Sequence, residues 1–235
     1  MKEIILLDGC TCAGGAAYGY YMAAKKLGLK IHVVGVDCDD KKTHPPIPNY
    51  EFVKDDLISF LHKNIKHFTH LNSSPPCQEY SPSTQTARNG GKVYKDILDP
   101  VQTIFRASHL PSVIENVPQA PLRPDVVLRG DMFGLKILKK RHFETNNFFM
   151  MNPCRPVIKG SVRDGDYATV VGHGSKKTRK GNADFKHQEL SGKSVRDIWQ
   201  YASGNFWMND YKDLSESIPW VYTEYIGEQF FKQYK

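Results

Sequence analysis

A cysteine and a glutamate each follow a predicted buried strand, and together they could act as a nucleophile and its acid partner. Cys77 comes after two prolines in the segment SSPPCQ at 73–78, so it lies on a stiff loop that can orient a reactive thiol. Glu115 follows the apolar segment 112–114. Because parallel strands end at the same edge of a sheet, Glu115 should reach the position of Cys77. The alternative for Cys77 is a buried small residue, since most single cysteines are structural.

A glycine-containing turn near the start of the chain indicates a platform for a nucleotide or cofactor. The segment Asp8–Gly15 has the sequence DGCTCAGG and lies between a predicted strand and a predicted helix, whose first amides would face a ligand. A tight turn that only closes a βα unit is the alternative. Asp37 ends the second strand, where an acid can bind ribose hydroxyls. Asp56 follows the third strand, and its alternative role is the N-cap of the next helix.

The placement of these residues depends on alternating strands and helices. Buried or short strands are expected at 3–8, 31–37, 51–53, 70–74 and 111–117. Helices are expected at 16–27, 56–66, 97–107, 195–202, 208–217 and 219–233. The repeated strand–helix order predicts an α/β fold with an open parallel sheet. The polar stretch 79–96 is predicted to be a long functional loop, the alternative being a disordered surface loop.

Composition limits the classes of protein to which the chain can belong. Its 235 residues include 32 Lys and Arg against 25 Asp and Glu, and the net charge of +7 is compatible with a polyanionic partner. The 40% of hydrophobic and 24% of charged residues exclude a fibrous or disordered chain. There is no run of about 18 apolar residues to predict a transmembrane helix, and Cys10-x-Cys12 has no second pair to complete a metal site. Five cysteines fit a reducing compartment, so we expect a cytoplasmic protein.

The chain changes character after about residue 150. Between 152 and 200 there are ten Lys and Arg against five Asp and Glu, with weak hydrophobic periodicity. We therefore expect a catalytic domain formed by 1–151 and 196–235, and a small basic lobe formed by 152–195. Within the lobe, the run KKTRK at 176–180 is suited to a phosphate backbone. A solvated charge run is the alternative.

Taken together, these motifs resemble those of the DNA cytosine-5 methyltransferases, most closely the compact ones encoded by bacteriophages and prophages. The segments that carry the resemblance are Asp8–Gly15, Asp37, Ser74–Gln78, Glu115–Val117, Lys139–Glu144 and Ile218–Gly227. They occur in the order of the family and cover nearly the whole chain outside 152–195. The resemblance implies a Rossmann-like, S-adenosylmethionine-dependent methyltransferase fold with a small basic recognition lobe. It also implies a monomer in a bacterial host cell, phage-encoded and of the restriction–modification kind, that needs no membrane and no metal.

The resemblance implies a reaction and a role for each catalytic residue. A methyl group would pass from S-adenosylmethionine to C5 of cytosine in double-stranded DNA, through a covalent Cys77–C6 adduct formed after base flipping. Glu115 would act near N3 of the base. Arg141 matches the second arginine of an Arg-x-Arg element and would act near O2, while Lys139 stands at the first arginine. Two other functions remain open: the same chemistry on RNA or a free nucleotide, and a decayed, non-catalytic DNA-binding relative.

The resemblance also implies a cofactor site, from which this sequence departs in part. The residues at its positions are Asp8, Gly9, Cys10, Thr11, Cys12, Gly14, Gly15, Asp37, Asp56, Pro76, Ser217 and Ile218. Asp37 would bind the ribose hydroxyls and Asp56 the adenine amine. The family has Asp-Leu-Phe-x-Gly-x-Gly-Gly at the turn, whereas this chain has Cys10 for the aromatic residue and Cys12 for the first glycine. Loss of the aromatic surface and an added Cβ predict a weaker cofactor site.

Contacts with DNA are expected from the loop after the nucleophile and from the basic lobe. The predicted residues are Gln78, Arg88, Lys92, Lys95, Arg155, Arg163, Lys176, Lys177, Arg179 and Lys180. Loop 79–96 would close over the flipped base. Arg155 and Arg163 are candidates for reading guanine, because a guanidinium can bind guanine with two hydrogen bonds.

The function of the run at 176–180 can be tested by substitution. Replacing Lys176, Lys177, Arg179 and Lys180 with Ala should weaken DNA binding without altering the sequence preference, because phosphate contacts carry no base information. For each phosphate that the variant no longer neutralises, the slope of log K against log salt should fall by about 0.9. Binding titrations at several salt concentrations measure this slope. An unchanged slope would identify a solvated charge run, and a changed sequence preference would mean that these residues read bases.

Overall fold

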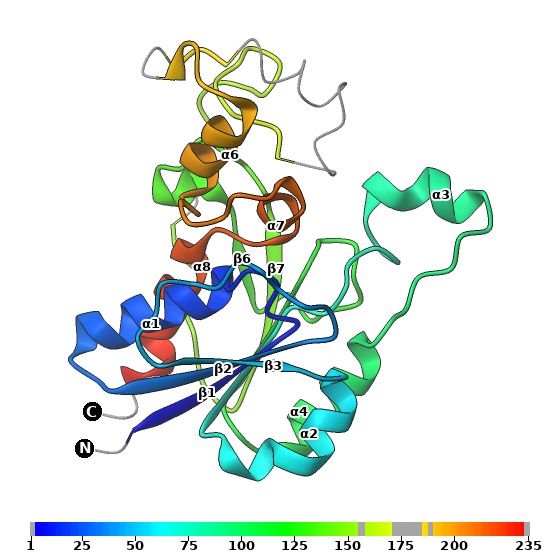
Figure 1. The fold of residues 1–235 in the computed structure, drawn as a ribbon, viewed down its shortest axis with the longest axis vertical. Helices are drawn as coiled ribbons and strands as arrows, with labels where there is room; N and C mark the ends of the chain where they lie inside the picture. Colours follow the sequence, from blue (N-terminus) through cyan, green and yellow to red (C-terminus); the bar gives the residue numbers. More distant parts are fainter. Residues whose placement is uncertain (1–2, 155–157, 171–184, 188–189, 233–235) are drawn as a thin grey trace.

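The computed structural model describes residues 3–154, 158–170, 185–187 and 190–232. At its centre is a seven-stranded sheet with the order β3-β2-β1-β4-β5-β7-β6 (Figure 1). The strands are β1 (Ile4–Gly9), β2 (Ile31–Asp37), β3 (Tyr50–Lys54), β4 (His70–Ser73), β5 (Ser112–Asn116), β6 (Val126–Leu128) and β7 (Arg141–Asn146). Their order reverses between β1 and β4, which places a topological switch point, the usual ligand position in such sheets, at the carboxyl ends of these two strands.

Strands β1 to β5 run parallel, and β7 runs antiparallel to both of its neighbours, β5 and β6. The predicted parallel arrangement is therefore confirmed for β1 to β5 but is wrong for this edge of the sheet. The segments that form β6 and β7 were not predicted as strands. Residues 126–128 are too few to show a periodicity, and β7 buries the successive residues 143–145, of which only Phe143 is apolar, so it shows neither an alternation nor an apolar run.

Helices cover both faces of the sheet. Helices α1 (Gly15–Leu27) and α8 (Trp220–Phe230) pack on one face, and α2 (Leu57–Asn64) and α4 (Leu98–Ser108) pack on the other (Figure 1). In the central strands, successive side chains point to opposite faces of the sheet, so the strands need apolar residues on both faces to pack against the two layers of helices. Leu6 packs with α1 and α8, for example, while Leu7 packs with α2 and α4.

The predicted helices are confirmed with small changes at their ends. Gly28 closes α1 in a left-handed conformation, as glycine at this position does in many helices. The helix predicted at 56–66 is α2 followed by the single turn η1 (Ile65–His67). Loop 79–96 is not irregular throughout, since it contains η2 (Pro82–Thr84) and α3 (Gln85–Asn89). Figure 1 shows α3 on an arm that projects away from the sheet.

A third apolar cluster links the basic stretch to the end of the chain. Ile137, which follows the short helix η3 (Gly130–Phe133), packs there with Ala168 and Val170. The same cluster contains Trp199 of α6 (Val195–Ser203) and Leu214 of α7 (Tyr211–Glu216). It crosses the boundary that the sequence predicted between 195 and 196. In the described part of the chain, the lobe and the helix after it therefore share a core.

Small residues bring α1 and α8 into close contact. Gly15, Gly19 and Ala23 recur every four residues of α1, so they lie on one face of the helix. Gly227 of α8 lies against Ala23, and the hydroxyl of Thr223 donates to the carbonyl of Ala16 over 2.9 Å. The two backbones approach so closely that side chains larger than these would not fit.

Gly19→Ala should test this contact. A Cβ at this position would lie 2.0 Å from the Trp220 carbonyl oxygen and 2.1 Å from the Thr223 hydroxyl. Overpacking against backbone should lower the free energy of unfolding by about 1–3 kcal/mol, measured by urea denaturation. Gly90→Ala is the control, because its nearest neighbour would lie at 3.4 Å. If Gly19→Ala were as stable as the control, the helices could not be in such close contact.

Candidate active site

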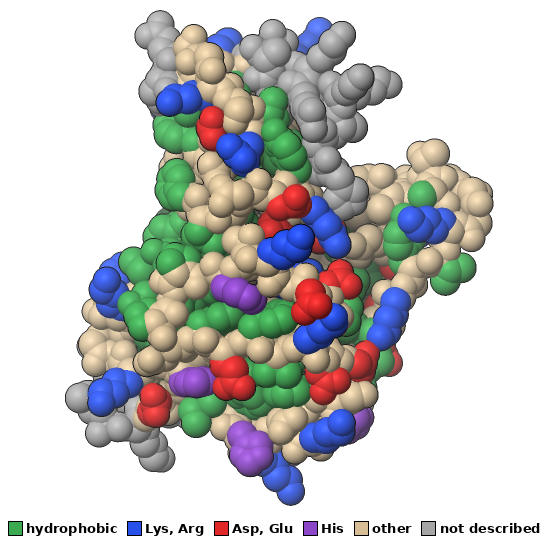
Figure 2. All heavy atoms as spheres, in the orientation of Figure 1, with side chains coloured by type: hydrophobic (Ala, Val, Ile, Leu, Met, Phe, Trp, Pro, Cys, Tyr) green, Lys and Arg blue, Asp and Glu red, His purple; other side chains and the backbone are tan. Residues whose placement is uncertain are grey.

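A cavity of about 880 Å³ opens at the switch point of the sheet. It takes in the turn after β1, the ends of β2 and β5, the loop after β4 and residues of α7. Lysine and acidic side chains gather on the surface between α7 and the carboxyl edge of the sheet (Figure 2). Among the residues predicted as catalytic, Cys77, Glu115, Lys139 and Arg141 all line this cavity.

Several hydrogen bonds hold the loop that carries Cys77. The amide of Ser74 donates to the carbonyl of Gly9 over 3.0 Å, and the side-chain amide of Asn116 donates to the carbonyl of Pro75 over 3.0 Å. The carbonyl of Cys77 itself accepts from the amide of Ser81 over 2.8 Å. Burial raises the pKa of the Cys77 thiol, while the positive charge of Arg141 acts in the opposite direction. The thiol is thus held in place but is not converted to the thiolate by the protein alone.

Asn116 was not singled out from the sequence, although it lies in the middle of the Glu-Asn-Val element. Besides holding Pro75, its side-chain oxygen accepts from the amide of Val117 over 2.8 Å. The residue is buried, so both of its hydrogen bonds are shielded from water. The signal that could have revealed it is its position directly after the acid at the end of a buried strand.

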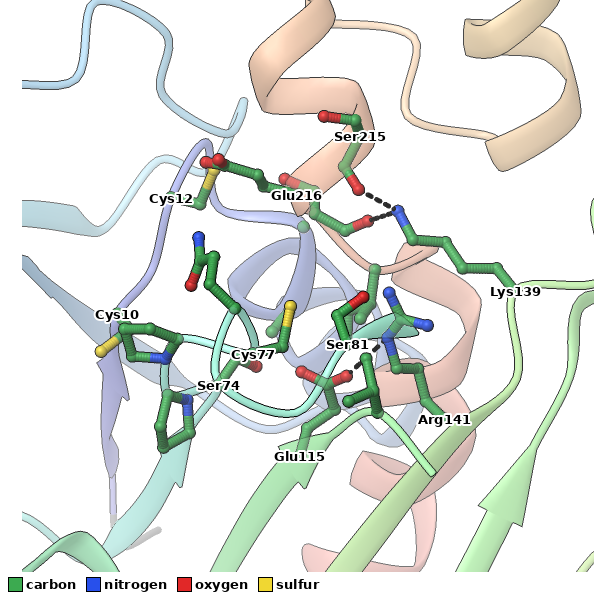
Figure 3. Close-up of a pocket in the computed structure, with 18 of the residues that line it drawn as sticks. Cys10, Cys12, Ser74, Cys77, Ser81, Glu115, Lys139, Arg141, Ser215 and Glu216 are labelled. Carbon is green, nitrogen blue, oxygen red and sulfur yellow. Dashed lines mark hydrogen bonds and ion pairs between the residues drawn. The ribbon is translucent and has the colours of Figure 1, made fainter. Parts of the chain in front are cut away.

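Glu115 and Arg141 form an ion pair of 2.9 Å at the base of the cavity (Figure 3). Glu115 faces Phe143 across the antiparallel pair of β5 and β7, and Arg141 is two residues before Phe143. The two charged side chains are therefore diagonal neighbours on one face of the sheet. Burial raises the pKa of Glu115, although Arg141 opposes this shift. A carboxyl with a raised pKa is suited to donating a hydrogen bond as well as accepting one.

A buried polar network supports the turn after β1. The carboxylate of Asp8 accepts from the hydroxyl of Thr11 over 2.6 Å and from the side-chain amide of Asn72 over 2.7 Å. The hydroxyl of Tyr20 in turn donates to Asn72 over 3.0 Å. Burial raises the pKa of Asp8 to about 6, even though these hydrogen bonds favour the charged form. Asp8 thus positions the turn through side chains from α1 and β4.

Cys10 and Cys12 adopt left-handed conformations, with φ of 55° and 50°. Residues other than glycine are strained in this region by roughly 1–2 kcal/mol, which explains why a glycine is suited to position 12. The thiol of Cys12 points toward Asp213 of α7 at 3.9 Å, and burial raises its pKa to about 11. Burial likewise raises the pKa of Cys10. Both thiols are therefore protonated near neutral pH, and Figure 3 shows them on the side of the cavity away from Arg141.

The carboxylate of Asp37 faces the same turn from the end of β2. It accepts from the amide of Cys12 and from that of Asp39, each over 3.0 Å. Lys41, which the sequence did not single out, lies 3.4 Å from this carboxylate and lines the cavity. Burial alone would lower the pKa of Lys41, but Asp37 raises it overall. The acid predicted to bind ribose hydroxyls therefore has a cation beside it.

Asp56 takes the alternative role that the sequence had left open. Its carboxylate accepts from the amide of Ser59 over 3.1 Å and so caps α2. The ammonium of Lys95 also donates to it over 2.8 Å, and this hydrogen bond lowers the pKa of Asp56 to about 2. Lys95 was predicted to meet phosphates, but the structure places it on Asp56. Both side chains still line the cavity.

Arg88 was also predicted to contact phosphates, and the structure gives it a contact within its own loop. Its Nη1 donates to the carbonyl of Gln78 over 2.7 Å and to that of Ser81 over 2.9 Å. The same nitrogen lies 2.6 Å from the hydroxyl of Thr84. Arg88 therefore holds the segment that follows the nucleophile.

The other predicted DNA contacts are distributed differently. Gln78 lines the cavity beside Cys77. The ammonium of Lys92 lies 5.0 Å from the ring centre of Tyr94, and Arg163 is exposed. The remaining predicted contacts lie outside the described residues: Arg155, Lys176, Lys177, Arg179 and Lys180.

Most of the predicted cofactor residues meet at one end of the cavity. Those that line it are Asp8, Cys10, Thr11, Cys12, Gly15, Asp37, Asp56, Pro76, Ser217 and Ile218. Gly9 and Gly14 do not line the cavity. Each is needed because a side chain at its position would clash with a neighbouring residue. A Cβ on Gly14, whose φ is 76°, would lie 2.4 Å from the ring of Pro45. Gly14 is therefore required where the chain turns into α1.

Two kinds of feature are absent from the residues that the structure describes. No group of three or more His, Cys, Asp or Glu side chains is arranged to hold a metal ion. Among these same residues, none of the helices has the length and apolar character needed to cross a bilayer.

Two solved structures share this arrangement at low sequence identity. A methyltransferase of Entamoeba histolytica, EhMeth, has a TM-score of 0.61 and 12% identity, with 100% of each chain covered. A mutant of DNMT2 from Spodoptera frugiperda has a TM-score of 0.63 and 11% identity, covering 97% of this chain and 100% of that chain. No protein-family model and no curated protein matches the sequence. The likeness establishes the fold: the predicted Rossmann-like α/β fold is confirmed, and these two methyltransferases share it.

Arg88→Ala should loosen the loop after the nucleophile. Removal of a charged donor to two carbonyls should cost roughly 1.5–3 kcal/mol of local stability. Cleavage by chymotrypsin after Tyr80 or Tyr94 should therefore become about 10- to 100-fold faster if cleavage requires the loop to open. Gln85→Ala, at an exposed position of α3, is the control and should leave the rate unchanged. Equal rates in the two variants would mean that Arg88 does not hold this loop.

Proposed function

We propose that this chain transfers a methyl group from S-adenosylmethionine to C5 of cytosine in double-stranded DNA. The observation that carries the proposal is the convergence of Cys77, Glu115 and Arg141 on one cavity that also includes the turn after β1 and Asp37. A nucleophile, an acid and a cation are the groups that activation of a cytosine ring requires. The fold shared with two methyltransferases supports the same class of reaction.

The residues at the β1 end of the cavity fit S-adenosylmethionine. Among the described residues, the buried hydroxyl of Ser217 has no nitrogen or oxygen partner and only the thiol of Cys12 beside it, so a polar ligand could satisfy it. The first turn of α1 offers amides, and a Cβ on Gly15 would lie 2.7 Å from the Ile218 carbonyl, so only glycine fits between them. Asp37 would bind the ribose, and Cys10, Asp56 and Leu57 would surround the adenine. When bound, S-adenosylmethionine supplies an electrophilic methyl group on a sulfonium.

In this mechanism Cys77 acts first on the ring. Its thiolate adds to C6 of cytosine, which makes C5 a nucleophile, and C5 then takes the methyl group. Loss of the C5 proton and elimination of Cys77 restore the aromatic ring and the free enzyme. The raised pKa of Glu115 allows its carboxyl to donate to N3 as negative charge develops there. Arg141 would stabilise charge at O2 and, through the 2.9 Å contact of its Nε with an oxygen of Glu115, keep the carboxyl aligned whether it is ionised or protonated.

Opposite requirements on two groups imply a pH optimum. Cys77 must lose a proton, and its raised pKa favours activity at higher pH. Glu115 must keep a proton, so activity should fall as the pH rises through its own raised pKa. The net charge of +7 is compatible with a polyanion such as double-stranded DNA, and the choice of DNA over RNA rests on the motifs of the sequence. A phage origin and a role in restriction–modification stay predictions from the sequence.

DNA that contains 5-fluorocytosine should trap the enzyme on its substrate. Because C5 carries fluorine in place of hydrogen, there is no C5 proton to remove, and elimination of Cys77 stalls after methyl transfer. With S-adenosylmethionine present, a denaturing gel should show a slower band of protein joined to DNA. Cys77→Ser should form no such band, and Cys154→Ser is a matched control at an exposed cysteine outside the cavity.

Parallel reactions separate the proposal from its alternatives. RNA that contains 5-fluorocytosine and the free fluorinated nucleotide are offered under the same conditions. A covalent product with RNA or nucleotide alone would assign the chemistry to that substrate and overturn the choice of DNA. Absence of a product with all three substrates would count against the mechanism and favour a non-catalytic DNA-binding protein.

A further inference from the structure

The ammonium of Lys139 lies against the end of α7. Its Nζ donates to the carbonyl of Leu214 over 3.3 Å and to that of Ser217. It also donates to the carbonyl of Ser215 over 2.8 Å (Figure 3). Three donors thus meet three backbone acceptors. The sequence placed Lys139 among the catalytic residues; in the structure it lines the cavity, and its ammonium donates to the protein backbone.

These carbonyls need a partner because they lie at or just after the end of a short helix. The last carbonyls of a helix have no amide to bind within it, and they carry partial negative charge. A partly buried ammonium satisfies several of them at once. The contact with Ser217 also extends past the helix into the linker before α8, so Lys139 fixes the path of the chain there.

The backbone of Lys139 is fixed in return. Its carbonyl accepts from the hydroxyl of Tyr222 in α8 over 2.9 Å, and the neighbouring carbonyl of Leu138 accepts from the amide of Gly130 over 3.1 Å. Lys139 lies two residues before Arg141, the first residue of β7. One residue therefore joins the strand that carries Arg141 to the linker between α7 and α8.

The linker forms one wall of the predicted cofactor site. Ser217 and Ile218 line the cavity, and Ile218 lies against the first turn of α1 beside Gly15. The groups around Lys139 include Arg141, Glu115, Cys77 and Cys12, which belong to both ends of the cavity. Burial and the nearby Arg141 lower the pKa of Lys139 to about 7. Lys139 thus lies between the predicted cofactor site and the residues proposed to act on the cytosine ring.

We propose that Lys139 is a positioning residue that holds the 217–218 wall of the cofactor site at a fixed distance from Cys77, Glu115 and Arg141. The inference rests on the proposed function and adds to it a role for the first position of the Lys-x-Arg element. Lys139 acts through the backbone of the linker. Because its contact connects the wall of the cofactor site to the strand that carries Arg141, it would keep the methyl donor and the base aligned.

The experiment compares Lys139→Met and Lys139→Arg with wild type in the full chain. Lys139→Met should weaken binding of S-adenosylmethionine about tenfold, measured by calorimetry, because it removes the charged hydrogen bonds to the wall. Hydrogen exchange of the amides at 215–218 should become faster. Lys139→Arg should restore most of both properties, since a guanidinium can also donate to several carbonyls. Lys140→Met, at an exposed neighbouring lysine, is the control and should match wild type.

The outcomes distinguish this inference from the proposed function. If wild type binds S-adenosylmethionine and Lys139→Met binds it equally well with unchanged exchange, the inference is wrong and the proposed function stands. A loss of turnover at saturating cofactor, with unchanged binding and exchange, would make Lys139 a catalytic residue instead. If wild type binds no S-adenosylmethionine, both the proposed function and the inference that rests on it are wrong. Should Lys139→Met not fold, Lys139→Arg decides, because wild-type exchange at 215–218 with tenfold weaker binding would contradict the inference.

Discussion

The ion pair between Glu115 and Arg141 depends on one antiparallel strand in an otherwise parallel sheet. Strand β7 runs back beside β5, so a residue at its start reaches the carboxyl end of β5. There Arg141 becomes the diagonal neighbour of Glu115 and balances a carboxylate that burial alone would neutralise. On the opposite face of β7, Glu144 is held in the same way by Arg106 of α4 at 2.7 Å. Two glutamate–arginine pairs thus anchor this strand, one in the cavity and one between the buried Glu144 and the half-exposed Arg106.

Buried polar groups elsewhere place the rest of the cavity. Asp8 is buried because Thr11 and Asn72 satisfy it, and Asn116 ties the loop of Cys77 to β5. An unsatisfied buried group of this kind would cost roughly 1–3 kcal/mol, so each of these hydrogen bonds also restricts where the backbone can go. The loop of Cys77 and the turn after β1 are therefore positioned by hydrogen bonds of buried side chains.

The turn after β1 combines this rigidity with strain. Cys10 and Cys12 both adopt left-handed conformations, and Cys12 is held there by contacts with β2 and α7, including the hydrogen bond from its amide to Asp37. Strained backbone persists only where its surroundings fix it, and it is often found at functional sites. The thiol of Cys12 occupies space next to α7, the helix whose end Lys139 holds. A shift of the turn, of α7 or of the segment that leads into β7 would therefore also move the other two.

The sequence alone determined the elements and the chemistry that follow local rules. Apolar runs and the glycine after α1 predicted β1, β2, α1 and their ends, because burial on both faces and helix capping depend on neighbouring residues. The motifs predicted which residues meet in one cavity. Only the tertiary structure decided the direction of β7, the partners of Arg88 and Lys95 and the contact of Lys139 with α7. A long cationic side chain binds whichever acceptor the fold brings within reach, and no local pattern in the sequence specifies that acceptor.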